Sequence, residues 1–325
     1  MKVFVAGGAG FIGSHLIGRL LGTTSATVTV YDNLSSGRLS HLEPHLENPR
    51  LRVVRGEIRE LDALAGAMSG HDVVYHLASN PDIARAVREP SIDFWEGTYL
   101  TQNVLEAMRT GGVGKIVYAS GSGVYGETGF TEVAEDYSPM LPISTYGASK
   151  LGCEALICSY CYMFEMNAAA FRFANVVGPH QTHGVGHDFV KNLLNNKSEL
   201  KILGDGTQSK SYIYVTDVIK AMRLLQKNNP SGFSYFNVAT LDYITVKEIA
   251  DVVIEVMGLS KVAYNFTGGK RGWKGDVPVI RMNSNKIRKL GWKNQYTAKD
   301  AIKKSVSSIY EDALAGRFGW TKEGA

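Results

Sequence analysis

Tyr146 and Lys150 are the two side chains of this sequence best placed for acid–base chemistry. They stand four residues apart at the start of a predicted helix, on one face of it. A tyrosine hydroxyl titrates near pH ~10, so it acts as a base only where a nearby positive charge favours the phenolate. Lys150 supplies that charge, and we expect the pair to remove a proton from a substrate hydroxyl. The same spacing at Tyr243 and Lys247 lacks the serine-rich loop, 120–122, that precedes the first pair, so we interpret it as structural.

A glycine-rich turn over 7–13 predicts a site for a dinucleotide. The turn follows an apolar strand over 2–6 and opens a helix, so its glycines let the phosphates approach the main chain and the helix N-terminus. Asp32 ends a second strand, 27–31, where its carboxylate would accept the ribose hydroxyls of NAD and repel the 2′-phosphate of NADP. We therefore predict NAD as the cofactor. NADP stays an alternative, because the nearby Arg38 would neutralise a 2′-phosphate.

Length and composition favour a two-lobed enzyme. The 325 residues are enough for a nucleotide-binding domain with a smaller lobe. No run is long and apolar enough to span a membrane, and the N-terminus runs directly into a strand, so we expect a cytoplasmic protein without membrane contact. The net charge of +4 is slight and the basic residues are dispersed, which argues against a nucleic-acid partner.

Three apolar strand-like runs predict a parallel sheet wound by helices, an α/β fold. They cover 72–77, 115–119 and 169–173, with helix-length segments between them. Ligands of such sheets lie beyond the carboxyl ends of the strands, so the loops after these runs are expected to line the site. The predicted fold is a Rossmann-type doubly wound parallel sheet with a smaller α/β substrate-binding lobe.

The two lobes are not expected to be contiguous in sequence. Residues 1–174 are the predicted NAD-binding domain, and 175–325 form mainly the substrate lobe. The segment 211–240 is expected to rejoin the first domain, because a helix from Val215 precedes a further strand over 235–239.

The histidines and cysteines are not expected to bind metal. His180, His183 and His187 lie in a glycine-rich loop that we interpret as a lid over the substrate. Cys158 and Cys161 share one predicted helix with Cys153, and a lone C-x-x-C on a helix is typical of packing. Thiols so placed indicate a reducing compartment.

Several further motifs occur in a recognisable order along almost the whole chain. They are the glycine-rich start with Asp32, His76-Leu77-Ala78, Val124-Tyr125-Gly126, Tyr146 with Lys150, Arg172-Phe173-Ala174-Asn175-Val176-Val177-Gly178-Pro179, and Asp205-Gly206-Thr207 through Tyr212 to Asp217. With them the chain resembles the extended short-chain dehydrogenase/reductases that act on nucleotide sugars, the NAD-dependent epimerase/dehydratase family, and most of all the UDP-glucose (UDP-galactose) 4-epimerases. The resemblance implies a homodimer paired through the helices near 91–108 and 145–164.

The resemblance also implies a reaction and its residues. NAD stays bound, Tyr146 takes the 4′-hydroxyl proton as C4′ gives up its hydride, and the hydride returns to the other face of the 4-keto sugar. The implied cofactor contacts are Gly7, Gly10, Phe11, Ile12, Gly13, Asp32, Asn33, Ser35, Gly37, Glu57, Ile58, Leu77, Ala78, Ser120, Tyr146, Lys150 and Phe173. For the substrate, Asn175 would bind the sugar diphosphate, Lys210 and Arg271 would supply cations near it, and Asp276 would reach the nucleotide ribose.

The chain departs from this family at two glycines. Gly121 stands where the family places a Ser or Thr that shares the substrate proton, and either Ser122, re-aimed by a bulge, or a water is expected to replace that hydroxyl. Gly97 stands where the 4-epimerases commonly carry an Asn near the cofactor. Neither the nucleotide base nor the sugar follows from the sequence, although Ile280 lies where the family gates its sugar pocket.

Two other functions remain open. A 4,6-dehydratase of this fold uses an Asp-Glu pair just before V-Y-G, whereas this chain has Ser122-Gly123 there, so only Glu127 or Glu132 from the next loop would reach in. Another oxidoreductase of nucleotide sugars belongs with this alternative. The third reading is a catalytically silent NAD-binding scaffold, since a fold alone does not guarantee activity. An acidic sugar is a further open point, for which Arg85, Arg88 or a lid histidine would meet the carboxylate.

Overall fold

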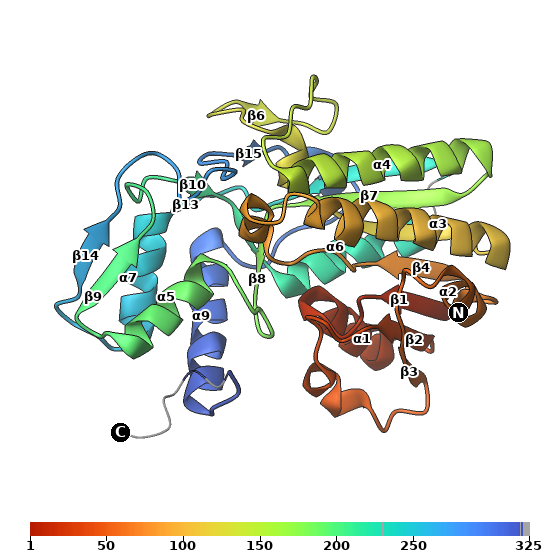
Figure 1. The fold of residues 1–325 in the computed structure, drawn as a ribbon, viewed down its shortest axis with the longest axis horizontal. Helices are drawn as coiled ribbons and strands as arrows, with labels where there is room; N and C mark the ends of the chain where they lie inside the picture. Colours follow the sequence, from red (N-terminus) through yellow and green to blue (C-terminus); the bar gives the residue numbers. More distant parts are fainter. Residues whose placement is uncertain (229–230, 319, 321–325) are drawn as a thin grey trace.

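A seven-stranded parallel sheet organises the chain, seen in a computed structural model that describes residues 1–228, 231–318 and 320. Its strand order is β12-β7-β5-β4-β1-β2-β3 (Figure 1). The strands are β1 (Lys2–Ala6), β2 (Thr27–Asp32), β3 (Leu51–Arg55), β4 (Val73–His76), β5 (Lys115–Gly121), β7 (Asn167–Phe173) and β12 (Phe233–Val238). The predicted Rossmann-type fold class is confirmed, because apolar β-branched runs buried on both faces form such sheets.

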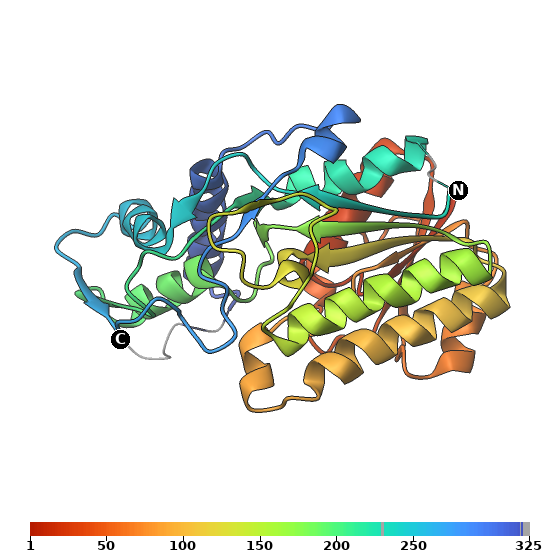
Figure 2. The ribbon, with the colours of Figure 1, turned by 90° about the horizontal axis from the view of Figure 1, so that it is seen from above.

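Helices cover both faces of the sheet. One face carries α1 (Phe11–Thr23) and α6 (Val215–Asn228); the other carries α2 (Leu61–Met68), α3 (Leu100–Gly111) and α4 (Thr145–Met163). Figure 2 shows α3 and α4 side by side along one side of the sheet, with α1 and α6 on the opposite side. Short helical turns complete this layer: η1 (Leu39–His41), η2 (Glu43–His45), η3 (Ile83–Val87), the π-helical η4 (Phe94–Tyr99) and η5 (Ser122–Tyr125).

A second lobe packs beside the carboxyl edge of the sheet. Its two-stranded pairs are β8 (Asn175–Val177) with β11 (Tyr212–Tyr214), β9 (Glu199–Ile202) with β14 (Ala263–Phe266), β10 (Ser209–Lys210) with β13 (Ile244–Thr245), and β15 (Arg281–Met282) with β6 (Glu132–Val133). Its helices are α5 (Val185–Asn195), α7 (Val246–Val256) and α9 (Ala298–Leu314), whereas α8 (Asn285–Lys289) packs against β12 of the central sheet. In Figure 1, α5, α7 and α9 lie together at the end opposite the N-terminus.

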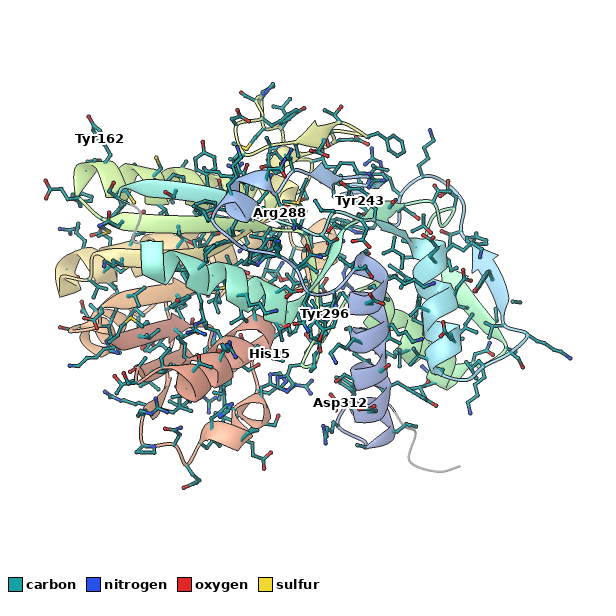
Figure 3. All side chains as sticks on the ribbon, turned by 180° about the vertical axis from the view of Figure 1, so that it is seen from behind. His15, Tyr162, Tyr243, Arg288, Tyr296 and Asp312 are labelled. Atoms are coloured by element: carbon teal, nitrogen blue, oxygen red, sulfur yellow. The ribbon has the colours of Figure 1, made fainter. Side chains whose placement is uncertain are left out.

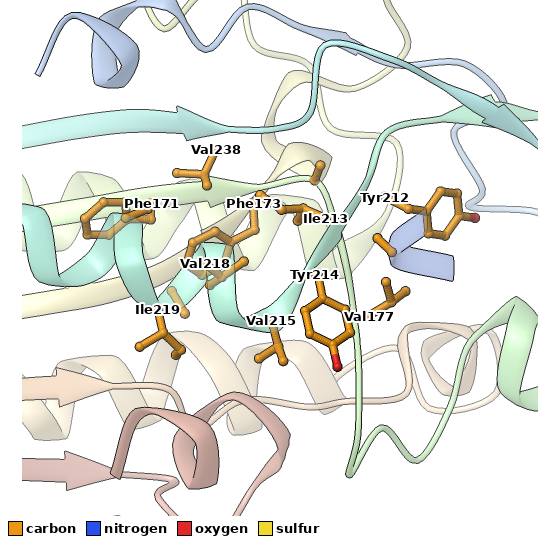
Figure 4. Close-up of a cluster of buried hydrophobic side chains, with 14 of the residues drawn as sticks. Phe171, Phe173, Val177, Tyr212, Ile213, Tyr214, Val215, Val218, Ile219 and Val238 are labelled. Carbon is orange, nitrogen blue, oxygen red and sulfur yellow. The ribbon is translucent and has the colours of Figure 1, made fainter. Parts of the chain in front are cut away.

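One buried cluster joins the lobes. Phe171 of β7 and Val238 of β12 lie in the same core as Ile213 of β11 and Val218 of α6, all almost fully buried (Figure 4). The segment 211–240 therefore contributes α6 and β12 to the sheet layer, where β12 pairs in parallel with β7. Residues 321–325 of the predicted substrate lobe lie outside the described residues.

Two further observations bear on the predicted class of protein. Cys153, Cys158 and Cys161 all lie in α4 as free thiols. Over the described ranges, no helix combines the length and the apolar character needed to cross a bilayer.

Candidate active site

A cavity of about 990 Å³ lies beyond the carboxyl ends of the strands and extends into the second lobe. All the predicted site residues line it except Arg271. This size suits a site for organic ligands, and the two chemically different ends of the cavity are described in turn.

The glycine-rich turn brings three backbone segments into contact at the cofactor end. Gly7 has a φ of +80°, and a Cβ placed on it would stand 2.6 Å from the backbone nitrogen of Ala78. A Cβ on Gly13 would stand 2.5 Å from the carbonyl oxygen of Gly7. Side chains at these positions would force the start of α1, the turn and the loop after β4 apart. The residues present therefore fit a dinucleotide pyrophosphate held against bare main chain.

Asp32 holds the turn as well as facing the cavity. Its carboxylate accepts hydrogen bonds from the backbone N–H of Ala9 at 2.9 Å and of Leu34 at 2.8 Å. Asn33 donates from Nδ2 to Glu57 at 3.0 Å, so a second carboxylate stands beside the same pocket wall. Arg38 is exposed and does not line the cavity. These contacts favour NAD over NADP at this end.

Helix α4 delivers the predicted catalytic pair to the cavity wall. Ser144 caps the helix by accepting a hydrogen bond from the Gly147 N–H at 3.1 Å, which fixes the first turn that carries Tyr146. The Lys150 ammonium donates to the carbonyl oxygen of Ala119 at 2.8 Å and lies 5.5 Å from the centre of the Tyr146 ring. Both residues line the cavity.

The protein by itself does not favour the Tyr146 phenolate. Burial raises the pKa of the Tyr146 phenol above its ordinary value, and Asp93 and Cys153 act in the same direction. Burial also lowers the pKa of Lys150 to about 8. Both charged forms lose hydration in the cavity wall. The positive nicotinamide ring of bound NAD would supply a further charge that favours the phenolate.

Asp93 is a buried carboxylate beside this pair that our sequence analysis missed. It accepts hydrogen bonds from Asn80 at 2.9 Å and from the Thr145 hydroxyl at 2.6 Å. Thr145 is the first residue of α4, so the carboxylate anchors the start of the helix next to Tyr146. It stands between Ile92 and Phe94, shortly after a proline, in a stretch that carries no local signal of this role.

A buried polar network ties the end of β5 and η5 to α4 and to the strands β7 and β12. The Ser120 hydroxyl donates to Glu154 at 2.5 Å, and Glu154 forms an ion pair with Arg172 at 2.7 Å. Arg172 donates in turn to the Tyr125 hydroxyl at 2.9 Å, which donates to Asn237 at 2.7 Å. Ser120 lines the cavity, yet its hydroxyl points to Glu154. Its side chain therefore joins the interior network, and Ser120 stays a predicted cofactor contact through the part of it that lines the cavity.

The two departures from the family pattern have different surroundings. Gly121 ends β5 in an extended conformation, and a Cβ on it would meet only the Phe173 carbonyl oxygen, at 3.9 Å. Ser122 lines the cavity from the 3₁₀ helix η5, which takes the place of the expected bulge. A Cβ on Gly97 would stand 2.3 Å from the Ser149 hydroxyl oxygen, so Gly97 makes room for α4 and does not line the cavity.

The substrate end differs from our expectation for Arg271. Lys210 and Asp276 line the cavity and form an ion pair at 2.5 Å. Arg271 lies outside the cavity, where its guanidinium pairs with Glu127 at 2.6 Å. Its direction follows from that carboxylate, which spacing along the chain does not reveal. Other residues that line this half were missed by our sequence analysis: Phe189, Lys191, Lys201, Leu203, Gln208, Tyr212 and Trp273.

The remaining candidate groups named below do not line the cavity with the predicted catalytic pair. Glu132 accepts a hydrogen bond from Asn283 at 2.6 Å, and like Glu127 it does not line the cavity. Arg85 forms an exposed ion pair with Glu89. Tyr243 packs its ring under Arg281 at 3.9 Å outside the cavity. Of the described residues, neither Glu127 nor Glu132 therefore brings a carboxylate to the cavity wall beside Val124-Tyr125-Gly126.

The three histidines of the predicted lid do not converge. His180 stacks between His41 at 4.3 Å and His15 at 5.2 Å, and Figure 3 shows His15 between α1 and α9. His187 packs against Trp320 at 4.5 Å, and His183 is the member of the three that lines the cavity. In the part of the chain that the structure describes, no group of three or more His, Cys, Asp or Glu side chains is placed to hold a metal ion.

Fold and site together define an NAD-dependent enzyme of the Rossmann type. Residues 3–239 match the NAD dependent epimerase/dehydratase family, and the chain belongs to that family. The UDP-glucose 4-epimerase of Mycolicibacterium smegmatis is 31% identical over 315 residues, which cover 94% of this chain and 97% of that protein.

Solved structures show the same similarity. A crystal structure of a UDP-galactose 4-epimerase has a TM-score of 0.86 and 36% identity and covers 96% of this chain and 99% of its own. The dTDP-glucose 4,6-dehydratase of Streptomyces venezuelae, solved with NAD bound, has a TM-score of 0.90 and 28% identity over 99% of both chains. The cofactor predicted from Asp32 and the glycine-rich turn is confirmed as NAD.

Proposed function

We propose that the protein is a nucleotide-sugar 4-epimerase that interconverts UDP-glucose and UDP-galactose, or a related nucleotide hexose, by transient oxidation at C4′. The observation that carries the proposal is one continuous cavity lined by Asp32 at one end, the Tyr146–Lys150 pair, and Asn175 with Lys210 at the other. A cofactor, a base and a group for the sugar diphosphate thus line one space.

The roles of the chain's own residues follow from their contacts. NAD, when bound, supplies a reversible hydride acceptor and a positive ring. The Tyr146 oxygen accepts the proton of the 4′-hydroxyl and gives it back after the sugar has turned. The Lys150 ammonium, anchored on the Ala119 carbonyl oxygen, favours the phenolate form and would hold the nicotinamide ribose. Ser122 or a water shares the substrate proton beside the open space at Gly121.

At the substrate end, the Lys210–Asp276 ion pair must open or reorient when a substrate binds. Lys210 would then face the diphosphate, while Asp276 would accept hydrogen bonds from the nucleotide ribose. The diphosphate would replace the carboxylate as the ionic partner of Lys210, and the ribose hydroxyls would satisfy the oxygens of the partly buried Asp276. Ile280, which is buried and lines the cavity, limits the sugar pocket.

A 4,6-dehydratase is the second candidate, favoured by the similarity to the Streptomyces enzyme. Elimination of water needs a carboxyl acid or base near C5′ and C6′. The pairing of Glu127 with Arg271 and of Glu132 with Asn283, both outside the cavity, speaks against it. A silent NAD-binding scaffold is the third candidate, and the retained Tyr146–Lys150 pair speaks against that.

NMR of the purified protein with UDP-glucose, UDP-N-acetylglucosamine and UDP-glucuronate in turn tests the proposal. A C4′-inverted product that disappears with Tyr146→Phe is the expected result. A 4-keto product detected by its absorbance in alkali would establish the dehydratase instead. If all three sugars stayed unchanged, the silent NAD-binding scaffold would be the remaining candidate. Ser122→Ala separates the two proton routes, because turnover falls only if the serine hydroxyl takes part.

We also propose a homodimer in the cytoplasm. Tyr162 at the end of α4 is 91% exposed (Figure 3), and Phe94 and Trp95 beside α3 are 52% and 46% exposed. Exposed aromatic side chains of this kind are typical of protein interfaces. Light scattering on the eluted protein measures the oligomeric state. The free thiols of α4 fit a reducing compartment.

A further inference from the structure

Trp273 presents an aromatic surface to the substrate half of the cavity. It lines the cavity from the loop before β15 and is partly exposed. Two other aromatic residues of this half, Phe189 and Tyr212, are 5% and 7% exposed, so little of their ring surface is free. Trp273 therefore carries the larger free ring face in this part of the site.

The turn around Trp273 fixes where the indole lies. A Cβ on Gly275 would stand 2.4 Å from Cζ3 of the indole, so the ring rests directly on the glycine backbone. The same Cβ would stand 3.3 Å from Cβ of Ser144, the residue that caps α4. The indole thus packs against a backbone segment that touches the helix end bearing Tyr146.

Hydrogen bonds and an ion pair hold the turn in this form. The Asp276 N–H donates to the Trp273 carbonyl oxygen at 3.1 Å, and the Gly272 N–H donates to the Asp276 carboxylate at 3.2 Å. The Arg271 guanidinium stabilises the turn by donating a hydrogen bond to the Asp276 carbonyl oxygen at 2.8 Å, and it also pairs with Glu127 outside the cavity. The arginine therefore points outward and the tryptophan faces the cavity.

We propose that Trp273 is a specificity-determining residue whose indole stacks on the hexose ring of the substrate. The inference rests on the proposed function, because a C4′ hydroxyl at Tyr146 places the hexose next to the Ser144 end of the cavity. The nucleotide lies farther along, beyond the Lys210–Asp276 pair.

An aromatic face suits this position chemically. It binds the C–H face of a pyranose by burying apolar area, without hydrogen bonds of fixed direction. A 4-keto sugar can then turn over while it stays in contact with the ring. Polar side chains at the same place would hold one orientation.

Calorimetric titration of the NAD-loaded Tyr146→Phe protein tests the assignment, because this background binds without turnover. UDP-glucose and UDP are titrated separately. Adding Trp273→Ala is expected to weaken UDP-glucose binding about tenfold and UDP binding less than about twofold. Trp273→Phe keeps an aromatic face and should recover most of the loss. Lys274→Ala, an exposed change in the same turn, is the matched control and should leave both affinities unchanged.

Each other outcome overturns the assignment. Equal losses for UDP and UDP-glucose would place the indole at the nucleotide, and no loss for either would remove it from the binding surface. Trp273→Phe that binds UDP-glucose as weakly as Trp273→Ala would also refute stacking. These results concern Trp273 alone. Failure of the proposed epimerase appears separately, as unchanged sugars in the NMR experiment with the unmodified protein.

Discussion

Replacement of Lys150 by methionine should make the NAD-free protein more stable at pH 7. Burial lowers the pKa of Lys150 to about 8 from its ordinary 10.5. At 1.36 kcal/mol per pKa unit, keeping the ammonium charged in the folded state costs about 3 kcal/mol below pH 8. The methionine removes that cost. It also loses the hydrogen bond to the Ala119 carbonyl oxygen, worth about 1 kcal/mol, so the expected net gain is about 2 kcal/mol.

The pH dependence identifies the cause. Between pH 8 and 10.5 the unfolded chain binds more protons at Lys150 than the folded one, so the stability of the unmodified protein rises with pH in this window. The advantage of Lys150→Met should therefore shrink to less than about 1 kcal/mol at pH 9.5. Urea unfolding at both pH values measures it, and Lys274→Met, an exposed change, is the control.

A stabilised variant that has lost turnover would show that the active site keeps a destabilising charge for the sake of the reaction. The reasoning is refuted if Lys150→Met is less stable than the unmodified protein at pH 7. A difference that stays constant from pH 7 to 9.5 would refute it too, because a packing change alone does not titrate.

Three further outcomes are expected. Gly13→Ala should lower the free energy of unfolding by about 2–3 kcal/mol, because the added Cβ overlaps backbone atoms. Gly22→Ala in the same helix meets nothing within 4 Å and should raise that free energy by about 0.5–1 kcal/mol. Equal effects of the two substitutions in thermal melts would contradict this. Glu154→Gln should lower the free energy of unfolding by about 3 kcal/mol, because Arg172 loses its buried counter-charge. An unchanged urea midpoint would contradict a stabilising role of this network. Gly121→Ser fits the open space and should raise turnover about tenfold in the NMR assay; unchanged turnover would contradict this.

Much of the fold and of the cofactor end was predictable from short stretches of sequence. The glycine-rich turn and Asp32 act through backbone shape and one carboxylate, and both are written in neighbouring residues. The parallel sheet followed from apolar runs that alternate with helix-length segments. Tyr146 and Lys150 are one helical turn apart, so their common face did not depend on the rest of the chain.

Contacts between distant segments account for what was missed. Asp93 reaches the start of α4 through Thr145, and Ser120 turns to Glu154 on the same helix. Neither partner is recognisable from spacing, because the hydrogen bonds join residues 52 and 34 positions apart. The direction of each hydroxyl was therefore decided by packing.

The sequence by itself determined the class of fold, the cofactor and the candidate base, because these depend on local periodicity and on residues within one turn or one helical repeat. Tertiary structure alone decided which charges line the cavity. Arg271 pairs with Glu127 outside the cavity, and the Trp273 indole packs on Gly275, where a larger side chain would clash with it. It also decided the protonation behaviour of Tyr146 and Lys150, because desolvation depends on everything packed around a group and not on its neighbours in the chain.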